Sequence, residues 1–326
     1  MAIADSSALQ YLKCTVVPVT ATLSKTERNF WIRRFERFFF IVVPKSRLIT
    51  NACMTNCAFI LCDMVKLPSV PESNQSEAMY DMIVSISQAH LAHCAYTQEK
   101  TLGLVRKPAL FQGITDQQGA GVQKVVLWQQ FASLLSPSIP HVVEFAKRIP
   151  SFQDLLQDDQ LLCIKLGFFE VWLVHAAHLS GESSLTFADG TCVSRHHMEI
   201  MFDREFVSLI FNFVDYFNGL HLSDNIIALY SAVVLVSAER DGIFGHKALQ
   251  QLQDQLLEAL RQQVTDERPA EPHLFPNLVS KLPELHLLGL QHLDHLRWFR
   301  ANWMHLRLSP LFAEVFDIPR PDSSQR

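Results

Sequence analysis

The stretch that decides the fold is VVEFAKRIPSFQDLLQDDQLLCIKLGFFEVWLV, residues 142–174. From Asp158 to about Leu179 the chain is apolar on nearly every side of the expected helix, which is typical of a helix buried between two layers of other helices. Such a helix lies at the centre of a bundle. The rest of the chain must therefore supply helices that cover it.

Helical periodicity continues before and after this stretch. Helices are expected at residues 76–106, 125–147, 202–218, 223–238, 246–265 and 273–305. The Ser136-Pro137 step weakens the middle of the second one, because proline lacks a backbone N–H. Two short β-prone runs around Asp189 and Gly190 predict one β-hairpin at residues 185–193. The pattern indicates an all-α protein with one small hairpin.

Composition fits one large helical domain. The chain has 326 residues, 48% of them hydrophobic, with 23 phenylalanines and only 11 glycines. That is enough apolar material for a sizeable core. Because the helical period becomes strong only from Ser76 onward, we place the domain at residues 76–320. Residues 1–75 are then a divergent or disordered extension, and residues 321–326 a tail.

Charge and cysteine usage limit the class of protein. A net charge of −5 gives no basic footprint, so we expect no direct contact with nucleic acid. Seven cysteines at irregular spacings fit the reduced thiols of an intracellular protein better than a disulfide framework. No run reaches the roughly 18 apolar residues that span a bilayer, and no secretion signal is present at the N-terminus. We expect a soluble protein without membrane contact.

An enzyme is not expected. His175 with His178, and His292 with His295, are i,i+3 pairs that lack a third metal ligand in sequence. GxSxG, HExxH and phosphate-binding glycine motifs are missing from the sequence. We therefore predict neither catalysis nor a metal site.

The end of the chain holds a second informative stretch, SPLFAEVFD, residues 309–317. Its apolar side chains fall at i, i+1, i+4 and i+5 and share one face: Leu311, Phe312, Val315 and Phe316. Ser309 supplies an N-cap, Pro310 the first helical position, and Pro319 a stop. The helix is shorter than the roughly 12–15 residues that an isolated helix needs in water. It should form only when docked, and with Glu314 it is suited to being a switch.

The central stretch resembles the signature of nuclear receptor ligand-binding domains, in which a pattern close to FAKxxPxFxxLxxxDQxxLLK joins the third helix to the fourth and fifth. The pattern is present as Phe145, Ala146, Lys147, Pro150, Phe152, Leu155, Asp159, Gln160, Leu161 and Lys165. The segments VVLVSAERDGI and KLPELHLLGLQH resemble the family's eighth helix and its long tenth and eleventh helices. Within the family the chain is most similar to the insect ecdysone-induced orphan receptors and the vertebrate Rev-erb group, over roughly residues 80–318. The resemblance implies a three-layer antiparallel helical sandwich of about 11–12 helices and a transcription regulator of the nucleus.

The resemblance also gives the terminal helix a role. A short LxxLL helix of a coactivator or corepressor leaves N–H groups at its start and C=O groups at its end without partners. A groove with a carboxylate at one end and an ammonium at the other satisfies both. Glu314 and Lys147 would form this charge clamp, with Lys165 as a second cation. The apolar floor of the groove would come from Val143, Ile164 and Leu311.

A ligand pocket is expected in the lower half of the domain, where bundles of this family take a small hydrophobic ligand. Its candidate lining residues are Trp128, Phe131, Leu134, Leu135, Phe169, Trp172, Phe187, Phe211 and His292. The aromatic side chains are bulky enough to fill the space themselves. An open pocket and a filled one are both compatible with the sequence.

His292 has three interpretations. The LGLQH match places it where the Rev-erb group presents a histidine to haem iron, and a neutral imidazole is a good iron ligand. Haem-binding members also use a cysteine just ahead of the third helix, and residues 113–127 contain none. A hydrogen bond to a ligand or to the terminal helix, or a plain core histidine, are the alternatives.

A further pair of residues bears on the dimer partner of this chain. In receptors of this family that heterodimerise, the carboxylate at Glu170 would meet Arg240 in a buried salt bridge that positions the dimer surface. His286 stands where the family often has an arginine after KLPxL. We expect a homodimer, or a heterodimer with an RXR-type receptor, through residues 273–305.

Competing interpretations concern what the receptor-like chain does. The first is a regulator that recruits coregulators through the groove, and an alternative is a haem-binding gas or redox sensor. Family members read DNA through two zinc sites with CxxC pairs, which this sequence lacks. Another alternative is therefore a dimerisation partner that is deficient in DNA binding.

Overall fold

The computed structural model describes residues 72–109 and 120–319. All of them belong to one of the two compact units of the chain, residues 59–326. The expected extension at residues 1–75, except its last four residues, and the expected tail at residues 321–326 lie outside the described residues.

The centre of the fold is helix α7, Gln157–Ala177, whose residues from Gly167 onward are all buried. It packs against α6 (Ser138–Arg148), α9 (Arg204–Gly219), α10 (Asp224–Leu235) and α13 (Leu282–Asn302). By length and composition alone α7 passes the test for a membrane span, but 67% of its apolar window is buried inside the protein. It is the central helix that the sequence predicts.

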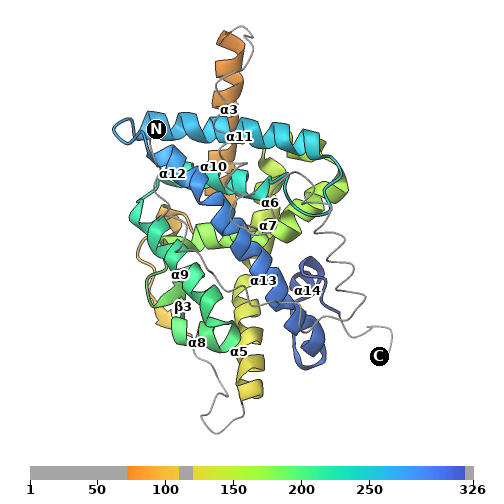
Figure 1. Cartoon of the computed structure of the whole chain (residues 1–326). Coiled ribbons are helices and arrows are strands. Elements are labelled where there is room, and N and C mark those ends of the chain that lie inside the picture. The colour runs from red at the N-terminus through yellow and green to blue at the C-terminus, as the bar shows by residue number, and fades with distance from the viewer. Residues whose placement is uncertain (1–71, 110–119, 320–326) are drawn as a thin grey trace, which may run out of the picture. The chain divides into compact units, whose positions relative to one another are not determined.

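Helix α10 shares the middle layer with α7. It is buried from Ile226 to Leu235 and contacts helices on either side, α3 (Glu72–His93) and α11 (His246–Glu267). In Figure 1, α11 crosses above α10, and the blue helix α13 descends from α12 (Leu274–Ser280) toward the C-terminal helix α14 (Pro310–Val315). The all-α sandwich expected from the sequence is confirmed.

Several expected helix boundaries are wrong. The helix expected at residues 76–106 ends at His93, and after a break a short helix, α4 (Gln98–Thr101), follows. At the break the Lys100 ammonium donates to the carbonyl oxygens of Leu91 and Cys94 at 2.6 and 2.7 Å and so satisfies groups at the end of α3.

Other expected helices divide in two. The helix expected at residues 125–147 is two helices, α5 (Ala120–Leu135) and α6, which separate at the Ser136-Pro137 step. The one expected at residues 273–305 divides into α12 and α13 at Lys281, just ahead of a proline in the first turn of α13. Helix α8 (Arg195–Met201), with Ser194 as its N-cap, was not expected.

The expected hairpin is present but belongs to a three-stranded sheet. Strands β2 (Ser184–Thr186) and β3 (Thr191–Ser194) pair antiparallel, and β1 (Lys107–Pro108) adds a parallel strand next to β3. Gly190 forms the turn with φ 83°, and a Cβ there would lie 2.2 Å from the carbonyl oxygen of Val105. A side chain at this turn would therefore push the first strand away.

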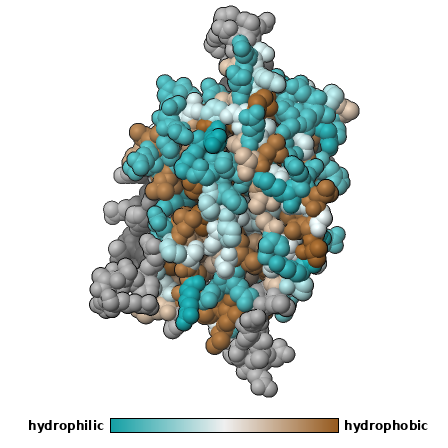
Figure 2. Space-filling view, turned by 180° about the vertical axis from the view of Figure 1, so that it is seen from behind, coloured by the Kyte–Doolittle hydropathy of each residue, from teal (hydrophilic) through white to brown (hydrophobic). Residues whose placement is uncertain are grey.

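The face of the domain that Figure 2 shows is mostly hydrophilic. On the face that Figure 2 shows, hydrophilic side chains cover most of the described surface and apolar side chains reach it in small, separate patches. Patches of this kind are normal for a folded domain, since much of any protein surface is apolar.

Candidate functional site

Helix α14 is a complete helical unit despite its length. The Ser309 side chain accepts a hydrogen bond from the backbone N–H of Phe312 at 3.2 Å, which caps the start of the helix. At the other end Asp317 adopts φ 50°, and the N–H of Ile318 donates to the carbonyl of Ala313 at 2.8 Å. This is a Schellman motif, so both ends are satisfied locally.

Apolar contacts dock α14 on the domain. Phe312 and Phe316 are buried, and their rings lie 5.8 Å from those of Phe299 on α13 and Phe168 on α7, respectively. Burying a phenylalanine contributes about 1.5–3 kcal/mol. These contacts supply the stability that so short a helix lacks in isolation.

Polar contacts from two other helices and from the turn after α5 fix the ends of α14. Ser309 lies 3.0 Å from the hydroxyl of Ser136, which follows α5. Arg300 on α13 donates to the carbonyl of Phe316 at 2.9 Å, and Lys165 on α7 pairs with Asp317 at 2.6 Å. The second cation expected in the groove, Lys165, is thus already used to hold the end of α14.

The outer face of α14 stays open to solvent. Glu314 is exposed and makes no ion pair within residues 72–109 and 120–319, and Leu311 is 40% exposed. The other expected floor residues, Val143 on α6 and Ile164 on α7, are half-buried. Apolar side chains and a carboxylate are therefore available to a partner on these elements.

Lys147 is the last-but-one residue of α6 and is exposed. It forms an ion pair with Glu144 at 2.7 Å, one turn back on the same helix. Exposed pairs of this kind contribute little to stability, because water and salt screen the charges. The pair holds Lys147 only weakly, so the ammonium can change partner at little cost.

The side chains expected to line a ligand pocket pack against one another. Phe131, Trp172 and Phe187 form a triangle of ring contacts with centroid distances of 5.3–6.1 Å. Phe169 joins through Trp172 at 5.7 Å, and Trp128 through Phe131 at 6.0 Å. Edge-to-face and tilted ring pairs stabilise a core beyond the area they bury.

Three further expected lining residues differ in their surroundings. Leu135 is buried at the end of α5, whereas Leu134 is only half-buried. Phe211 is buried on α9, and the guanidinium of Arg195 lies 5.3 Å from its ring.

His292 lies in the middle of α13 and is fully buried. Its ring stacks on Phe169 at 4.0 Å and meets Phe316 of the terminal segment at 5.6 Å. Neither ring nitrogen has a hydrogen-bond partner in the described protein, and burial lowers the pKa of His292 to about 3. The side chain is therefore neutral, and it supports the terminal helix by ring packing rather than by a hydrogen bond.

Haem does not fit around His292. The free nitrogens would allow iron ligation, but Phe169 covers one ring face and Phe316 packs on the imidazole, so a porphyrin would have to displace the segment that ends α14. The sequence also offers no cysteine in residues 113–127 as a second ligand. We derive no function through haem.

A buried salt bridge joins α7 to the loop after α10. Arg240 donates to both oxygens of Glu170 at 3.0 and 2.9 Å and to the carbonyl of Val234 at 2.8 Å. Arg240 is 2% exposed and Glu170 3%. His286 on α13 approaches the same carboxylate at 3.5 Å. The fold therefore brings Glu170 and Arg240 together, as the resemblance implied.

Two glycines make room for this bridge. A Cβ on Gly289 of α13 would lie 2.1 Å from Oε1 of Glu170, and a Cβ on Gly167 of α7 would lie 2.8 Å from Nη2 of Arg240. The helices can approach the charged groups only because both positions lack a side chain. Sequence reasoning missed both glycines.

Asp159 is a structural residue that the sequence did not reveal as such. It is fully buried at the start of α7, and its carboxylate accepts the backbone N–H groups of Phe244 and Gly245 at 2.8 and 2.7 Å. Gly245 is the N-cap of α11, so this carboxylate satisfies free donors at the start of that helix and complements its dipole. The Asp of the central signature thus connects two layers.

The fold and the site together define a class of protein: a helical sandwich with an aromatic core, closed at its C-terminus by a short docked helix with an exposed carboxylate. A family model described as the ligand-binding domain of nuclear hormone receptor matches residues 121–302. The chain belongs to this family.

Curated relatives agree with the family match. Ecdysone-induced protein 78C of Drosophila melanogaster is 46% identical over 251 residues, 75% of this chain and 29% of its own length. Nuclear receptor subfamily 1 group D member 2 of Rattus norvegicus is 39% identical over 178 residues, 54% of this chain and 31% of its own length. Nuclear hormone receptor E75 of Metapenaeus ensis is 28% identical over 264 residues, 74% of this chain and 43% of its own length. The chain spans less than half the length of each of these transcription-regulating relatives.

Proposed function

We propose that this chain is a receptor domain that regulates transcription in the nucleus by binding LxxLL helices of coregulators. The observation that carries the proposal is the state of α14: its inner face is buried through Phe312 and Phe316, while Leu311 and Glu314 face solvent. A helix docked in this way presents one carboxylate and one leucine on an outer face. Nuclear receptors are generally regulators rather than enzymes, and we propose no catalysis here.

The clamp would work through unsatisfied backbone groups of the partner helix. Glu314 would accept from the free N–H groups at the start of that helix, and Lys147 would donate to the free carbonyls at its end. Val143, Ile164 and Leu311 would receive its leucines. Each polar contact contributes roughly 0.3–2 kcal/mol, so most of the affinity comes from the buried leucines.

The test is a fluorescence-polarisation titration of the full chain with a labelled LxxLL peptide. Glu314→Lys should abolish saturable binding, and Lys147→Ala should weaken it. Asp254→Lys, an equal change of charge at an exposed position of α11, is the matched control and should bind as the original chain does. Unchanged peptide affinity in Glu314→Lys would refute the proposed charge clamp.

Dimerisation through residues 273–305 is the second part of the proposal. Leu287 and Leu290 on α13 are 40% and 51% exposed and lie three residues apart, so they share a helix face. Burying this face would favour association with a second copy or with an RXR-type receptor. Light scattering should show that Leu290→Arg shifts the chain toward monomer; an unchanged mass would reject this surface.

A further inference from the structure

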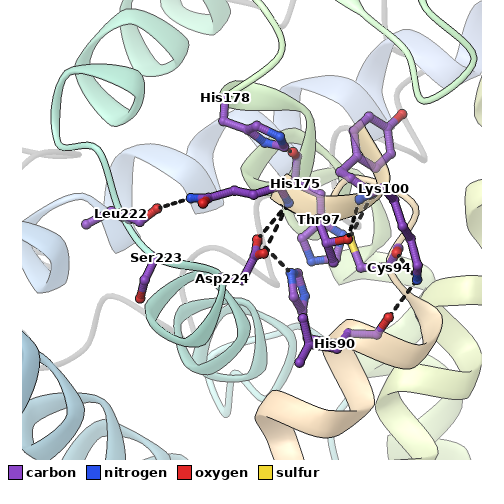
Figure 3. A network of polar contacts seen from close by, with 12 residues as sticks. His90, Cys94, Thr97, Lys100, His175, His178, Leu222, Ser223 and Asp224 are labelled. Atoms are coloured by element: carbon purple, nitrogen blue, oxygen red, sulfur yellow. Dashed lines mark hydrogen bonds and ion pairs between the residues drawn. The ribbon is translucent and has the colours of Figure 1, made fainter. Parts of the chain in front are cut away.

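Two helices bring three metal-ligating side chains together near the end of α3. His90 on α3 and Cys94 just after it are spaced i,i+4, and His175 comes from the last turn of α7 (Figure 3). One ligand atom from each residue lies within 4.8 Å of the others. All three side chains are buried. The cluster includes none of the residues proposed for the groove and none of the rings that pack on His292.

The two histidines have ring nitrogens that nothing satisfies. In the described protein both nitrogens of His90 and the Nε2 of His175 are buried without a hydrogen-bond partner. A buried polar atom without a partner destabilises the fold, because it has lost its hydrogen bonds to water. The ring centroids lie 5.0 Å apart, edge to face, and one nitrogen of each ring lies within 4.8 Å of the other. Such unpaired atoms are unusual in a core unless something binds there.

Burial keeps the two imidazoles neutral but disfavours the Cys94 thiolate. Burial lowers the pKa of His90 to about 4 and the pKa of His175 well below its usual value, so both imidazoles keep free lone pairs at neutral pH. Burial raises the pKa of the Cys94 thiol to about 12, so the thiol would release its proton only when a cation binds. The backbone N–H of Tyr96 lies 3.3 Å from Sγ and would stabilise the resulting thiolate.

A carboxylate stands behind one of the histidines. Asp224 Oδ1 lies 3.9 Å from Nε2 of His90, and the backbone N–H of Gln98 holds this carboxylate at 3.1 Å (Figure 3). Metal-bound histidines commonly donate their other ring N–H to such a group, which fixes the ring and its tautomer. Nε2–H of His90 can point toward Asp224, which leaves Nδ1 free for a metal.

Space for a fourth ligand lies beside the cluster. A cavity with room for about one water molecule, ≈ 10 Å³, is lined by Cys94 and His175 together with Tyr96, Ser138, His141 and Phe145. His141 is exposed, so the cavity lies next to solvent and offers an entry path. A water molecule here could complete a tetrahedral site.

We propose that His90, Cys94 and His175 form a Zn²⁺ site with a water molecule as the fourth ligand. Two imidazoles and one thiolate suit this borderline-soft ion, whereas Mg²⁺ and Ca²⁺ require oxygen ligands. Zinc bonds of about 2.0–2.3 Å need ligand atoms roughly 3.5 Å apart, so side-chain rotations must bring the most distant pair about 1 Å closer. Binding releases the Cys94 proton to solvent and joins α3 to the central helix α7.

Two other basic side chains near the site, Lys100 and His178, are engaged with other groups. The Lys100 ammonium lies nearby but donates to the carbonyls of Leu91, Ala92 and Cys94 (Figure 3), which disperses its charge. His178 is turned toward Thr101 and the carbonyl of His175. Asp224 supplies the compensating negative charge.

Cobalt binding tests the proposal on the full 326-residue chain. Reduced, metal-free protein is titrated with Co²⁺, whose thiolate complexes absorb in the near ultraviolet. The original chain should show this band, Cys94→Ser should lose the Cys94 contribution, and Cys192→Ser, a half-buried cysteine on β3, should keep it. The cysteines of residues 1–71 are present in all three proteins, so the difference between them isolates Cys94. Identical spectra for the chain and Cys94→Ser would overturn the proposal.

Thermal unfolding with Zn²⁺ provides the second readout. Zinc should raise the midpoint of the original chain, and His175→Asn should lose that increase while His178→Asn keeps it. An increase that survives in His175→Asn would show that the ion binds elsewhere, and no increase in any protein would rule out the site. Each variant's unfolding midpoint with zinc is compared with its own midpoint without zinc. A variant that is less stable than the original chain is therefore still informative.

Discussion

Replacing Arg240 by methionine should destabilise the domain strongly. The substitution removes two hydrogen bonds to Glu170 and one to the carbonyl of Val234, and it leaves a carboxylate that is 3% exposed with only His286 beside it, at 3.5 Å. Breaking a buried pair from one side costs about 3–5 kcal/mol, because the remaining charge stays uncompensated. If the free energy of unfolding falls by about 3 kcal/mol per molar urea, this loss lowers the urea midpoint of unfolding by roughly 1–2 M.

The assay is urea unfolding followed by far-ultraviolet circular dichroism. Arg261→Met is the matched control, since Arg261 pairs with Glu258 on the exposed side of α11, where a lost pair costs less than about 1 kcal/mol. The double variant Glu170→Met with Arg240→Met should recover much of the loss, because no lone charge remains. The reasoning is refuted if Arg240→Met unfolds like the control, or if the double variant loses the sum of the two single losses.

Three further predictions use the same unfolding measurement. Gly289→Ala places a methyl group against Glu170 and should lower the free energy of unfolding by about 1–3 kcal/mol. Gly121→Ala is the control, because a Cβ there meets nothing within 4 Å, and it should cause no such loss. Equal unfolding midpoints of the two variants would contradict this prediction. Asp159→Ala removes two charge-assisted hydrogen bonds at the start of α11 and should cost about 2–4 kcal/mol, so a loss below about 1 kcal/mol would speak against the capping role. Burial lowers the pKa of His292 below its unfolded value, so the stability it contributes is complete above pH 6.5 and is lost toward pH 3. As the pH falls from 7 to 5, the free energy of unfolding of His292→Leu should therefore decrease by about 2 kcal/mol less than that of the original chain. Parallel pH profiles of the two proteins would exclude this.

Much of the fold could be predicted because its signals are local. The apolarity of residues 158–179 on all sides defines α7, and Ser309 and Pro310 define the start of α14. The resemblance to nuclear receptors added Glu170 and Arg240, which no periodicity connects. The clamp formed by Lys147 and Glu314 comes from the same source and stays a prediction.

The missed features depend on contacts that the sequence does not display. Nothing in the local periodicity signals the break after α3, where Lys100 satisfies carbonyl groups at the end of the helix. Strand β1 has only two residues and no alternation of its own. The metal cluster was missed because the sequence shows His175 beside His178, whereas folding pairs it with His90 and Cys94 from another layer.

Helix α13 combines an exposed apolar face with a contact that holds the terminal helix α14. The helix carries the exposed leucines Leu287 and Leu290 on one face, and through Arg300 it also caps the carbonyl of Phe316 at the end of α14. A partner bound along α13 would therefore contact the helix that also holds the end of α14. Thermodynamic linkage makes such an influence reciprocal: if dimerisation tightens peptide binding by some factor, the peptide strengthens the dimer by the same factor.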